Sequence, residues 1–510
     1  MDIRLTRRSM LAALPLAMAT PGIARAAALK GGTLRVAILA DVNNYDPQSF
    51  ITPNFPLIKN LYDSLIEYTP DGHAIPSLAS AWAIAPDHQS VAVTLREGVA
   101  FQSGAPLDAA AVAATLKKAA DPVRGKNLFS TMGPVRDWSV GDAHTITLNF
   151  KAPTPGRAIT DLLQFISVID PAGTDTVETK PAGSGAYMLA ERVLGQRVRL
   201  VANARYWRAG EPVFAEIVLT VFSDNEAAGA ALESGGVDLI YGGGSRTGVR
   251  LRNAGFQLIE GPGPLVQVLR LNATRGPFRN AKFRQAFNVL VDRQAVLKVG
   301  YAGLGQVTAL PWAPASPAAD PSYNQTYAFN LEKGQALLKE CGLTPAEMSD
   351  WKLLVLGDDQ DNAAICQVVQ SDLGKVGIKV PLDLKQGSEY FGLMLAGTFD
   401  ATFAAAGNVQ KFPSRITTNS IYRTAKNPVL GDPNPFPAYV AAIERVNATV
   451  GSGAEARAAY DALNQALVQA AFGIPTNTYD IGLIVAAKNL GGVTLDIDNM
   501  LVARTMGFTG

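Results

Sequence analysis

The stretch WKLLVLGDDQDNAAICQVVQSDLGKVGIKVPLDLK, residues 351–385, decides the fold class of this chain of 510 residues. Its two ends, WKLLVLG and IKVPLDLK, have the length and apolar content of strands. Between them, the pattern over 361–377 is typical of a helix. A strand, a helix and a strand in this order predict parallel pairing with a right-handed crossover. The sequence therefore predicts an α/β protein.

The segment KFRQAFNVLVDRQAVLKVG, residues 282–300, carries the most regular apolar pattern in the chain. Its apolar side chains recur at i, i+3, i+4, i+7 and i+8 from Phe283, which predicts an amphipathic helix over the segment. Helical patterns also cover 331–342, after the N-cap residue Asn330, 106–119, with Asp108 as its N-cap, and 55–68. Strands are expected at 31–39, 91–101, 144–150, 197–203 and 215–222.

The sequence Gly261-Pro262-Gly263-Pro264 is the sharpest break between expected elements. Glycine and proline are typical of turns, and the apolar run LVQVLRLNA at 265–273 then continues as a strand. We interpret this break as the first point where the chain crosses from one lobe to another.

The N-terminal segment TRRSMLAALPLAMATPGIARA, residues 6–26, has the order of features of an export signal. Arg7 and Arg8 precede an apolar run of about half the roughly 20 residues that span a bilayer, and small residues flank Arg25. The paired arginines resemble a twin-arginine signal peptide. A core helix is the alternative interpretation. We expect cleavage near Ala26, export to the periplasm and a soluble mature chain.

Composition is typical of a well-packed globular protein. Hydrophobic residues make up 48% and charged residues 17%, and the formal net charge is +1. A chain so close to neutral has no overall field that attracts nucleic acid, so no nucleic-acid partner is expected. The two cysteines, Cys341 and Cys366, could form a disulfide in an oxidising compartment or could be ordinary buried thiols.

A series of short motifs follows in order along the mature chain. The first runs from Leu61-Tyr62-Asp63-Ser64-Leu65 through Pro76-x-Leu78-Ala79-x-x-Trp82 to Leu95-Arg96-x-Gly98-Val99-x-Phe101. It is followed by GSGAYML (183–189), NARYW (203–207), LESGGVDLI (232–240), PFRNAKFRQAFNVLVDR (277–293) and LLKECGL (337–343). Together they resemble the extracytoplasmic solute-binding proteins of the peptide/nickel/opine class, family 5, which feed ABC importers.

The resemblance implies the two-lobed periplasmic binding protein fold of the cluster C type, an α/β fold with an extra subdomain inserted in lobe I. The expected ranges are 1–26 for the signal peptide, 27–262 for lobe I with its subdomain at about 55–180, 263–474 for lobe II and 475–510 for the C-terminal return to lobe I.

The resemblance also implies a function. The chain would be the solute-binding component of an ABC import system, would capture a peptide-like or other small polar solute by hinge closure, and would deliver it to a permease and its ATPase. It would act as a monomer and need no cofactor. An opine, sugar-conjugate or chelated-metal binder is the alternative, and a periplasmic chaperone, receptor or hydrolase on the same scaffold is a remote one.

Loops that follow strands and face the cleft are the expected source of ligand contacts. The candidates are Asn43 and Asn44 after the first strand, Tyr241, Gly243 and Ser245 in YGGGS, Asp358 and Asp359 after KLLVLG, Tyr390 as an apolar wall, and Asn408 and Gln410 after FDATFAAAG. The glycine run could present backbone N–H groups to an anion or could be a flexible turn.

The loop at 407–413, GNVQKFP, departs from the pattern of peptide binders in this class. Those proteins place an acidic residue there, where it pairs with the α-amino group of the peptide. The loop here contains no acid, and Gly357, Asp358 and Asp359 replace a basic residue that some members use. We therefore expect a polar solute other than a simple dipeptide in the usual orientation, such as an opine-like or modified amino acid conjugate.

Histidine is too scarce for most hydrolytic or metal sites. The chain has three, at positions 73, 88 and 144, and it lacks the G-x-S-x-G, H-E-x-x-H and P-loop motifs. A triad or zinc site needs a histidine beside its partners. We expect no catalytic residue and no metal site.

Overall fold

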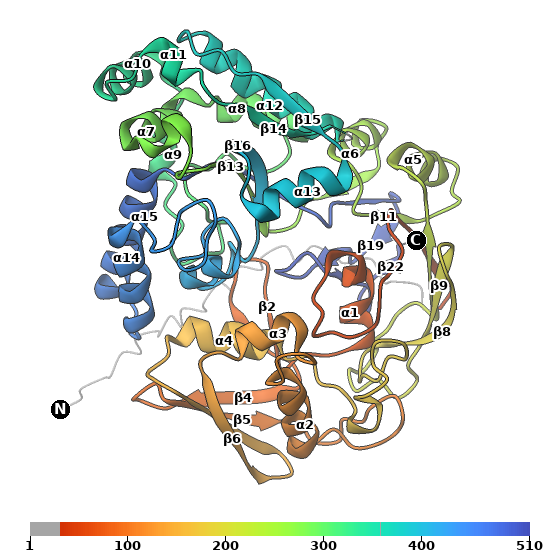
Figure 1. The fold of residues 1–510 in the computed structure, drawn as a ribbon. Helices are drawn as coiled ribbons and strands as arrows, with labels where there is room; N and C mark the ends of the chain where they lie inside the picture. The colour runs from red at the N-terminus through yellow and green to blue at the C-terminus, as the bar shows by residue number, and fades with distance from the viewer. Residues whose placement is uncertain (1–30, 358, 510) are drawn as a thin grey trace, which may run out of the picture.

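Two large β-sheets and a smaller four-stranded sheet organise residues 31–357 and 359–509, the part of the chain that this computed structural model describes (Figure 1). The expected export segment at 1–26 and the site candidate Asp358 lie outside that part. The first sheet has seven strands in the order β12-β18-β11-β1-β10-β9-β8. They are β1 (Thr33–Ile38), β8 (Tyr187–Val193), β9 (Arg197–Ala202), β10 (Glu216–Val221), β11 (Leu239–Tyr241), β12 (Gln257–Ile259) and β18 (Ile484–Ala486).

The seven-stranded sheet brings the two ends of the chain together. Its central strand β1 pairs in parallel with β10 and β11, whereas β18, from the C-terminal end, is antiparallel to β11 and β12. Side chains of α1 (Phe55–Leu61) complete its core on one side, and those of α5 (Asn225–Glu233) and α6 (Ser245–Asn253) on the other. The strands expected at 31–39, 197–203 and 215–222 are thereby confirmed.

A four-stranded antiparallel sheet follows β1 in the chain and forms the lower part of Figure 1. Its order is β4 (Ala79–Ile84), β5 (Ser90–Leu95), β7 (Thr145–Phe150) and β6 (Val135–Asp142). It shares a core with α2 (Ala109–Ala119), α3 (Lys126–Thr131) and α4 (Gly156–Phe165). The side chain of Asp108 accepts the N–H of Ala111 at 2.9 Å, which confirms the expected N-cap.

The second large sheet has the order β15-β14-β16-β13-β17. Its strands are β13 (Leu265–Leu271), β14 (Leu353–Leu356), β15 (Leu382–Lys385), β16 (Ala401–Ala406) and β17 (Gly473–Tyr479). β14 and β15 are parallel and are joined through α12 (Gln360–Gly374), as the opening stretch predicts. The other helices of this half are α7 (Ala281–Leu290), α8 (Arg293–Tyr301), α9 (Ser322–Thr326), α10 (Leu331–Glu340), α11 (Pro345–Met348), α13 (Gly387–Ala396), α14 (Pro437–Ala448) and α15 (Ala454–Ala470).

The chain passes between the two large sheets at two places. Residues 260–264 connect β12 of the first sheet to β13 of the second, and residues 480–483 connect β17 back to β18. Short pairs complete the fold: β2 (Ile66–Tyr68) with β3 (Ala74–Pro76), β19 (Leu490–Gly491) with β22 (Gly507–Phe508), and β20 (Thr494–Leu495) with β21 (Leu501–Val502).

Two expected helices differ from the structure. The helix expected at 282–300 is two helices, because the side chain of Asp292 accepts the N–H of Ala295 and starts α8 as a new N-cap. The helix expected at 55–68 ends at Leu61. Asp63, just beyond it, accepts hydrogen bonds from Tyr206 and Trp207, and Ile66–Tyr68 pairs with β3 instead. Tertiary contacts override the local helical pattern here.

Both cysteines are free and buried. Within residues 31–357 and 359–509, no helix is long and apolar enough to cross a membrane.

Candidate functional site

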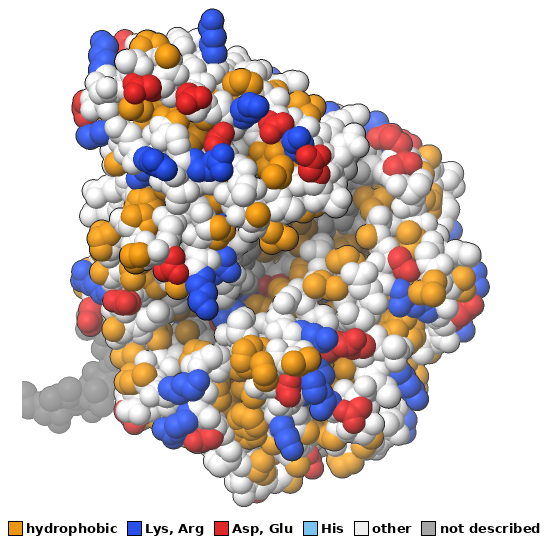
Figure 2. Space-filling model, in the orientation of Figure 1, with side chains coloured by type: hydrophobic (Ala, Val, Ile, Leu, Met, Phe, Trp, Pro, Cys, Tyr) orange, Lys and Arg blue, Asp and Glu red, His pale blue; other side chains and the backbone are white. Residues whose placement is uncertain are grey.

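A cavity of about 360 Å³ lies between the two halves of the molecule. Figure 2 shows the surface hollowed between the upper and lower parts. Loops and helices of both halves, the two lobe-crossing segments and one strand residue, Leu265 of β13, contribute its walls, so no single element forms it. From the N-terminal half come Pro47, Gln48, Phe50, Thr52, Phe55, Asn127, Leu128, Ser130, Thr131 and Phe165; from the second half, Pro264, Leu265, Gly407, Asn408, Gln410, Arg415 and Thr418; from the C-terminal segment, Ile481 and Asp498.

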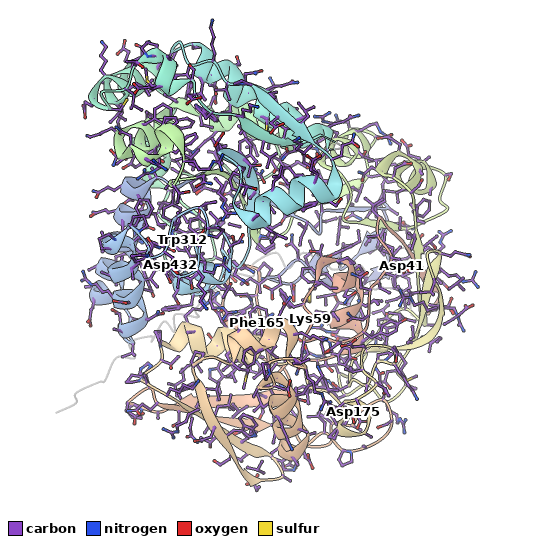
Figure 3. The ribbon with its side chains drawn as sticks, in the orientation of Figure 1. Asp41, Lys59, Phe165, Asp175, Trp312 and Asp432 are labelled. Carbon is purple, nitrogen blue, oxygen red and sulfur yellow. The ribbon has the colours of Figure 1, made fainter. Side chains whose placement is uncertain are left out.

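Three phenylalanines form an aromatic wall of the cavity. The ring of Phe50 contacts those of Phe55 and Phe165 edge-on, with centroid distances of 5.1 and 4.8 Å. Phe165 is the last residue of α4 and is labelled near the centre of Figure 3. Edge-to-face aromatic packing fixes the rings, so this wall offers a rigid apolar surface.

A buried ion pair lies at the cavity wall, where one of its two members, Asp498, lines the cavity. Lys411, in the loop after β16, is fully buried, and its Nζ lies 2.9 Å from Oδ1 of Asp498. Gln164 and Gln410 each donate a side-chain amide to the same carboxylate, at 2.8 and 2.7 Å. A buried carboxylate needs such partners, and here the protein supplies all of them.

A second buried carboxylate, Asp161 of α4, binds the same loop. It accepts the N–H of Phe412 at 2.6 Å and the hydroxyl of Tyr68 at 2.9 Å, and Nε of Arg157 lies 3.0 Å away. The guanidinium of Arg157 also donates to the backbone oxygen of Gln410. The loop at 407–413 is thus held to the N-terminal half by Asp161 and to the C-terminal segment by Asp498.

Arg415 brings a cation to the cavity wall. Its Nη2 donates to Oγ1 of Thr131, on α3, at 2.7 Å, and its Nε is buried with no hydrogen-bond partner in the described part of the chain. Burial lowers the pKa of this guanidinium below its ordinary value, and the nearby Asp161 opposes that shift. The pKa of Asp496, farther along the C-terminal segment, is raised to about 6 by burial, although Lys59 lies 3.6 Å away.

The crossings beside the cavity are tied to each other. Asp480, in the second crossing, accepts the N–H groups of Gly261 and Gly263 in the first, both at 2.8 Å. Asn499 donates its side-chain amide to Asp480 at 2.7 Å. A single carboxylate therefore joins both connections between the sheets.

The structure brings two of the predicted site residues to the cavity, Asn408 and Gln410. Asn408 donates its amide to Thr418 at 3.1 Å. The Oε1 atom of Gln410 is buried and has no partner among the described residues.

The other described candidates make contacts within the protein. The backbone N–H groups of Asn43 and Asn44 point to the side chain of Asn54. The hydroxyl of Tyr241 donates to the backbone of Asn499, and that of Tyr390 to the backbone of Phe403.

The glycine run after β11 has no free amide in its turn. The N–H groups of Gly242 and Gly243 donate to the backbone oxygen of Leu483, and that of Gly244 donates to Asn225. Ser245 starts α6, and Asp359 caps α12 through the N–H groups of Asp361 and Asn362. The contacts of the YGGGS turn favour the turn interpretation over an anion site.

Sequence reasoning missed Arg415, Phe165 and Asp498 as lining residues. Arg415 follows a proline in the short 3₁₀ helix Pro413–Thr418, and nothing in that pattern marks it. The loop GNVQKFP contacts two acids, Asp161 and Asp498, which come from distant segments of the chain. The sequence shows that the loop itself contains no acid, but it does not show which acids contact the loop. Among the described residues, no cluster of three His, Cys, Asp or Glu side chains could hold a metal ion.

Two sheets joined by two tied crossings, with a cavity between them, define a two-lobed binding protein. The model of the bacterial extracellular solute-binding proteins, family 5 Middle, matches residues 73–427, which include strands of all three main sheets. The chain belongs to the family 5 bacterial extracellular solute-binding proteins. It is the periplasmic solute-binding component of an ABC import system.

Individual relatives bind different solutes. The glutathione-binding protein GsiB of Salmonella paratyphi A is 28% identical over 380 residues, 72% of each chain, and that of Escherichia coli K12 is 26% identical over 391 residues, 74% of this chain and 73% of the relative. NikA from Brucella suis, solved with Fe(III)-EDTA, has a TM-score of 0.79 and 25% identity, and covers 92% of this chain and 98% of its own.

A further solved structure, AgaA from Agrobacterium tumefaciens R10 with agropinic acid, has a TM-score of 0.75 at 22% identity, over 94% of this chain and 99% of its own. At this identity the likeness supports the fold alone. The two-lobed fold expected from the sequence motifs is thereby confirmed.

Proposed function

We propose that the 360 Å³ cavity is the place where this protein captures its solute. The observation that carries the proposal is that both halves supply the walls and also contact each other there. Gln410 with Asp498 and Arg415 with Thr131 are hydrogen bonds that span the halves. Contacts of this kind form only when two lobes are closed, so solute binding and closure favour each other.

We place lobe I before residue 260 and lobe II between the crossings at 260–264 and 480–483, with the C-terminal residues returning to lobe I. The pairing of β17 with β13 supports a second crossing a few residues beyond the expected boundary at 474. The four-stranded sheet is the subdomain inserted in lobe I. The permease, with its ATPase, recognises the closed form of the protein. The protein is exported by the twin-arginine route and acts as a monomer.

The solute is small and polar and is not a simple dipeptide in the usual orientation. The loop at 407–413 offers no acid to an α-amino group, and its one ionisable side chain, Lys411, is paired with Asp498. An opine-like or modified amino acid conjugate fits this loop better. Relatives that bind glutathione, or that were solved with agropinic acid or a metal chelate, are consistent with such a solute.

Mass spectrometry of the solute released by denaturing purified protein tests the proposed location. Ser130 is exposed and lines the cavity, so Ser130→Trp places an indole at its wall. Ser139→Trp is the matched control, because Ser139 is exposed on β6 and does not line the cavity. We expect wild type and S139W to release the solute and S130W to release none. Equal release from S130W would place the solute elsewhere.

The export route has its own test. Replacing Arg7 and Arg8 by lysine keeps the charge but removes the paired arginines, so we expect the precursor to remain in the cytoplasm. Normal recovery from the periplasm would contradict the twin-arginine route and leave the solute-binding proposal intact.

A further inference from the structure

The cation of Arg415 is not balanced by a carboxylate. Its Nη2 donates to a neutral hydroxyl, that of Thr131, and its Nε is buried and finds no partner among residues 31–357 and 359–509. The nearest carboxylate that influences it, Asp161, already accepts from Phe412 and Tyr68 and pairs with Arg157. A buried guanidinium that lacks a counterion is costly, so the site is suited to an anion supplied from outside.

Among the described residues, Arg415 and Asp498 are the two charged side chains that line the cavity. The charge of Asp498 is neutralised by Lys411, whereas that of Arg415 has no ion-pair partner within the part of the chain that the structure describes. One unbalanced positive charge favours a ligand that carries a single negative charge.

Of the described residues, one acid, Asp498, lines the cavity, and it is unavailable to a ligand cation. Asp498 is paired with Lys411 at 2.9 Å and accepts amide hydrogens from Gln164 and Gln410. Lys411 therefore occupies the position in which a ligand ammonium would be neutralised. An ammonium entering the cavity would meet the guanidinium of Arg415 and no free carboxylate among the described residues, which disfavours it.

A neutral hydrogen-bond donor on the ligand would find an acceptor in the cavity, the side-chain oxygen of Gln410. Oε1 of Gln410 is buried and accepts no hydrogen bond from the described residues, while its Nε2 donates to Asp498. Beside it the aromatic wall of Phe50, Phe55 and Phe165 accepts apolar surface.

We propose that the solute is a monocarboxylate without a free ammonium group, with its carboxylate bound by Arg415 and a neutral hydroxyl or amide N–H accepted by Oε1 of Gln410. N-acylated amino acids and N-acylated dipeptides are the chemical class that this arrangement recognises. The inference rests on the proposed location of the solute in this cavity.

Three matched libraries test the proposal by equilibrium dialysis with a mass-spectrometric readout: N-acetyl dipeptides, the same dipeptides with free amino groups, and the N-acetyl dipeptides as C-terminal amides. We expect wild-type protein to retain members of the first library alone. Arg415→Gln should weaken their binding roughly ten- to hundredfold, because a hydrogen-bonded charge pair is lost. Arg415→Lys should retain more affinity than Arg415→Gln. Arg252→Gln, which removes an exposed arginine on α6, should bind as wild type does.

Lys411→Met tests whether Lys411 takes the place of a ligand ammonium, because this change removes the cation that is paired with the Asp498 carboxylate. This variant should gain binding of free dipeptides, and the double variant Lys411→Met/Asp498→Asn should not. Thermal melting establishes that each variant is folded.

Retention of free dipeptides or of the C-terminal amides by wild type would overturn the proposal, as would unchanged binding by Arg415→Gln or retention of no library. A solute that is released by wild type but not by S130W and that carries an ammonium group would overturn this inference and leave the cavity as the binding site.

Discussion

The carboxylate of Asp480 accepts the N–H of Gly263 over 2.8 Å, so the segment leaving the five-stranded sheet is bound to the segment entering it. The other oxygen of the carboxylate accepts the N–H of Gly261 at 2.8 Å. The crossings therefore bend as one unit around a shared acceptor, and lobe movement has to preserve or break these bonds. Glycine at 263 has a φ of 63°, a left-handed conformation that other residues rarely adopt.

Removing this acceptor should loosen the connection. Asp480→Ala leaves two backbone N–H groups and the Asn499 amide without their partner, so we expect a loss of about 1–3 kcal/mol in the free energy of unfolding. Urea unfolding measures this loss of stability. Solute dissociation should also become faster, because the closed form is less restrained. Asp350→Ala, at an exposed aspartate, is the control and should change neither. If Asp480→Ala is stably folded and its solute dissociation rate is unchanged, the hydrogen bonds of Asp480 do not control lobe movement.

The buried Lys411–Asp498 pair should show strong coupling. Lys411→Met alone leaves a buried carboxylate without its cation, which we expect to destabilise the protein by about 3–5 kcal/mol. The double variant with Asp498→Asn should recover most of this loss, because no buried charge of that pair is then left. Denaturant unfolding of wild type, both single variants and the double variant gives the coupling free energy. If the changes in unfolding free energy of the two single variants add up to that of the double variant, the interaction between Lys411 and Asp498 contributes no stability.

Asp496 should make stability depend on pH. Burial raises its pKa from 3.8 to about 6, so between these values the folded state binds the proton more strongly than the unfolded state. The stability that this group contributes is full below pH about 4 and is lost as the pH rises through about 6. Asp496→Asn lacks the titration. The melting temperature of the variant, measured relative to wild type, should therefore rise between pH 4 and pH 6 and then level off. A difference that is constant over this range would contradict the shifted pKa.

Two helical glycines should respond in opposite directions to alanine. A Cβ at Gly334 of α10 would lie 2.2 Å from Cδ2 of the buried Leu290, so Gly334→Ala should destabilise by about 1–3 kcal/mol. A Cβ at Gly374 of α12 meets nothing within 4 Å, and Gly374→Ala should stabilise by about 1 kcal/mol through helix propensity. Thermal or urea unfolding of the two variants compares them directly. Stabilisation by Gly334→Ala would show that α10 and α7 can separate without cost.

Much of the fold could be predicted because its signals are local. The apolar patterns of 351–385 give two strands and a helix, and the chain has few ways to connect them other than a parallel crossover. The caps Asp108 and Asn330 bond to N–H groups three residues away, so sequence contains both partners. The ordered motifs identify the family in the same way.

The cavity could be predicted only in part. Asn408 and Gln410 lie directly after a strand, and that position was enough to select them. The same rule, that side chains after a strand face the cleft, also selected Asp359 and Tyr241, which contact other parts of the protein. An oxygen after a strand can as readily cap a helix, as in Asp359, or bond to a neighbouring segment, as in Tyr241.

The sequence by itself determined several strands, several helices and the family, and it selected one loop, at 407–413, that lines the cavity. Only the tertiary structure decided which charges meet. Lys411 and Asp498 are 87 positions apart, and Arg415 and Thr131 are 284 apart, so no local pattern relates them. Burial makes the balance of those charges selective, and burial exists only once the two halves have closed on each other.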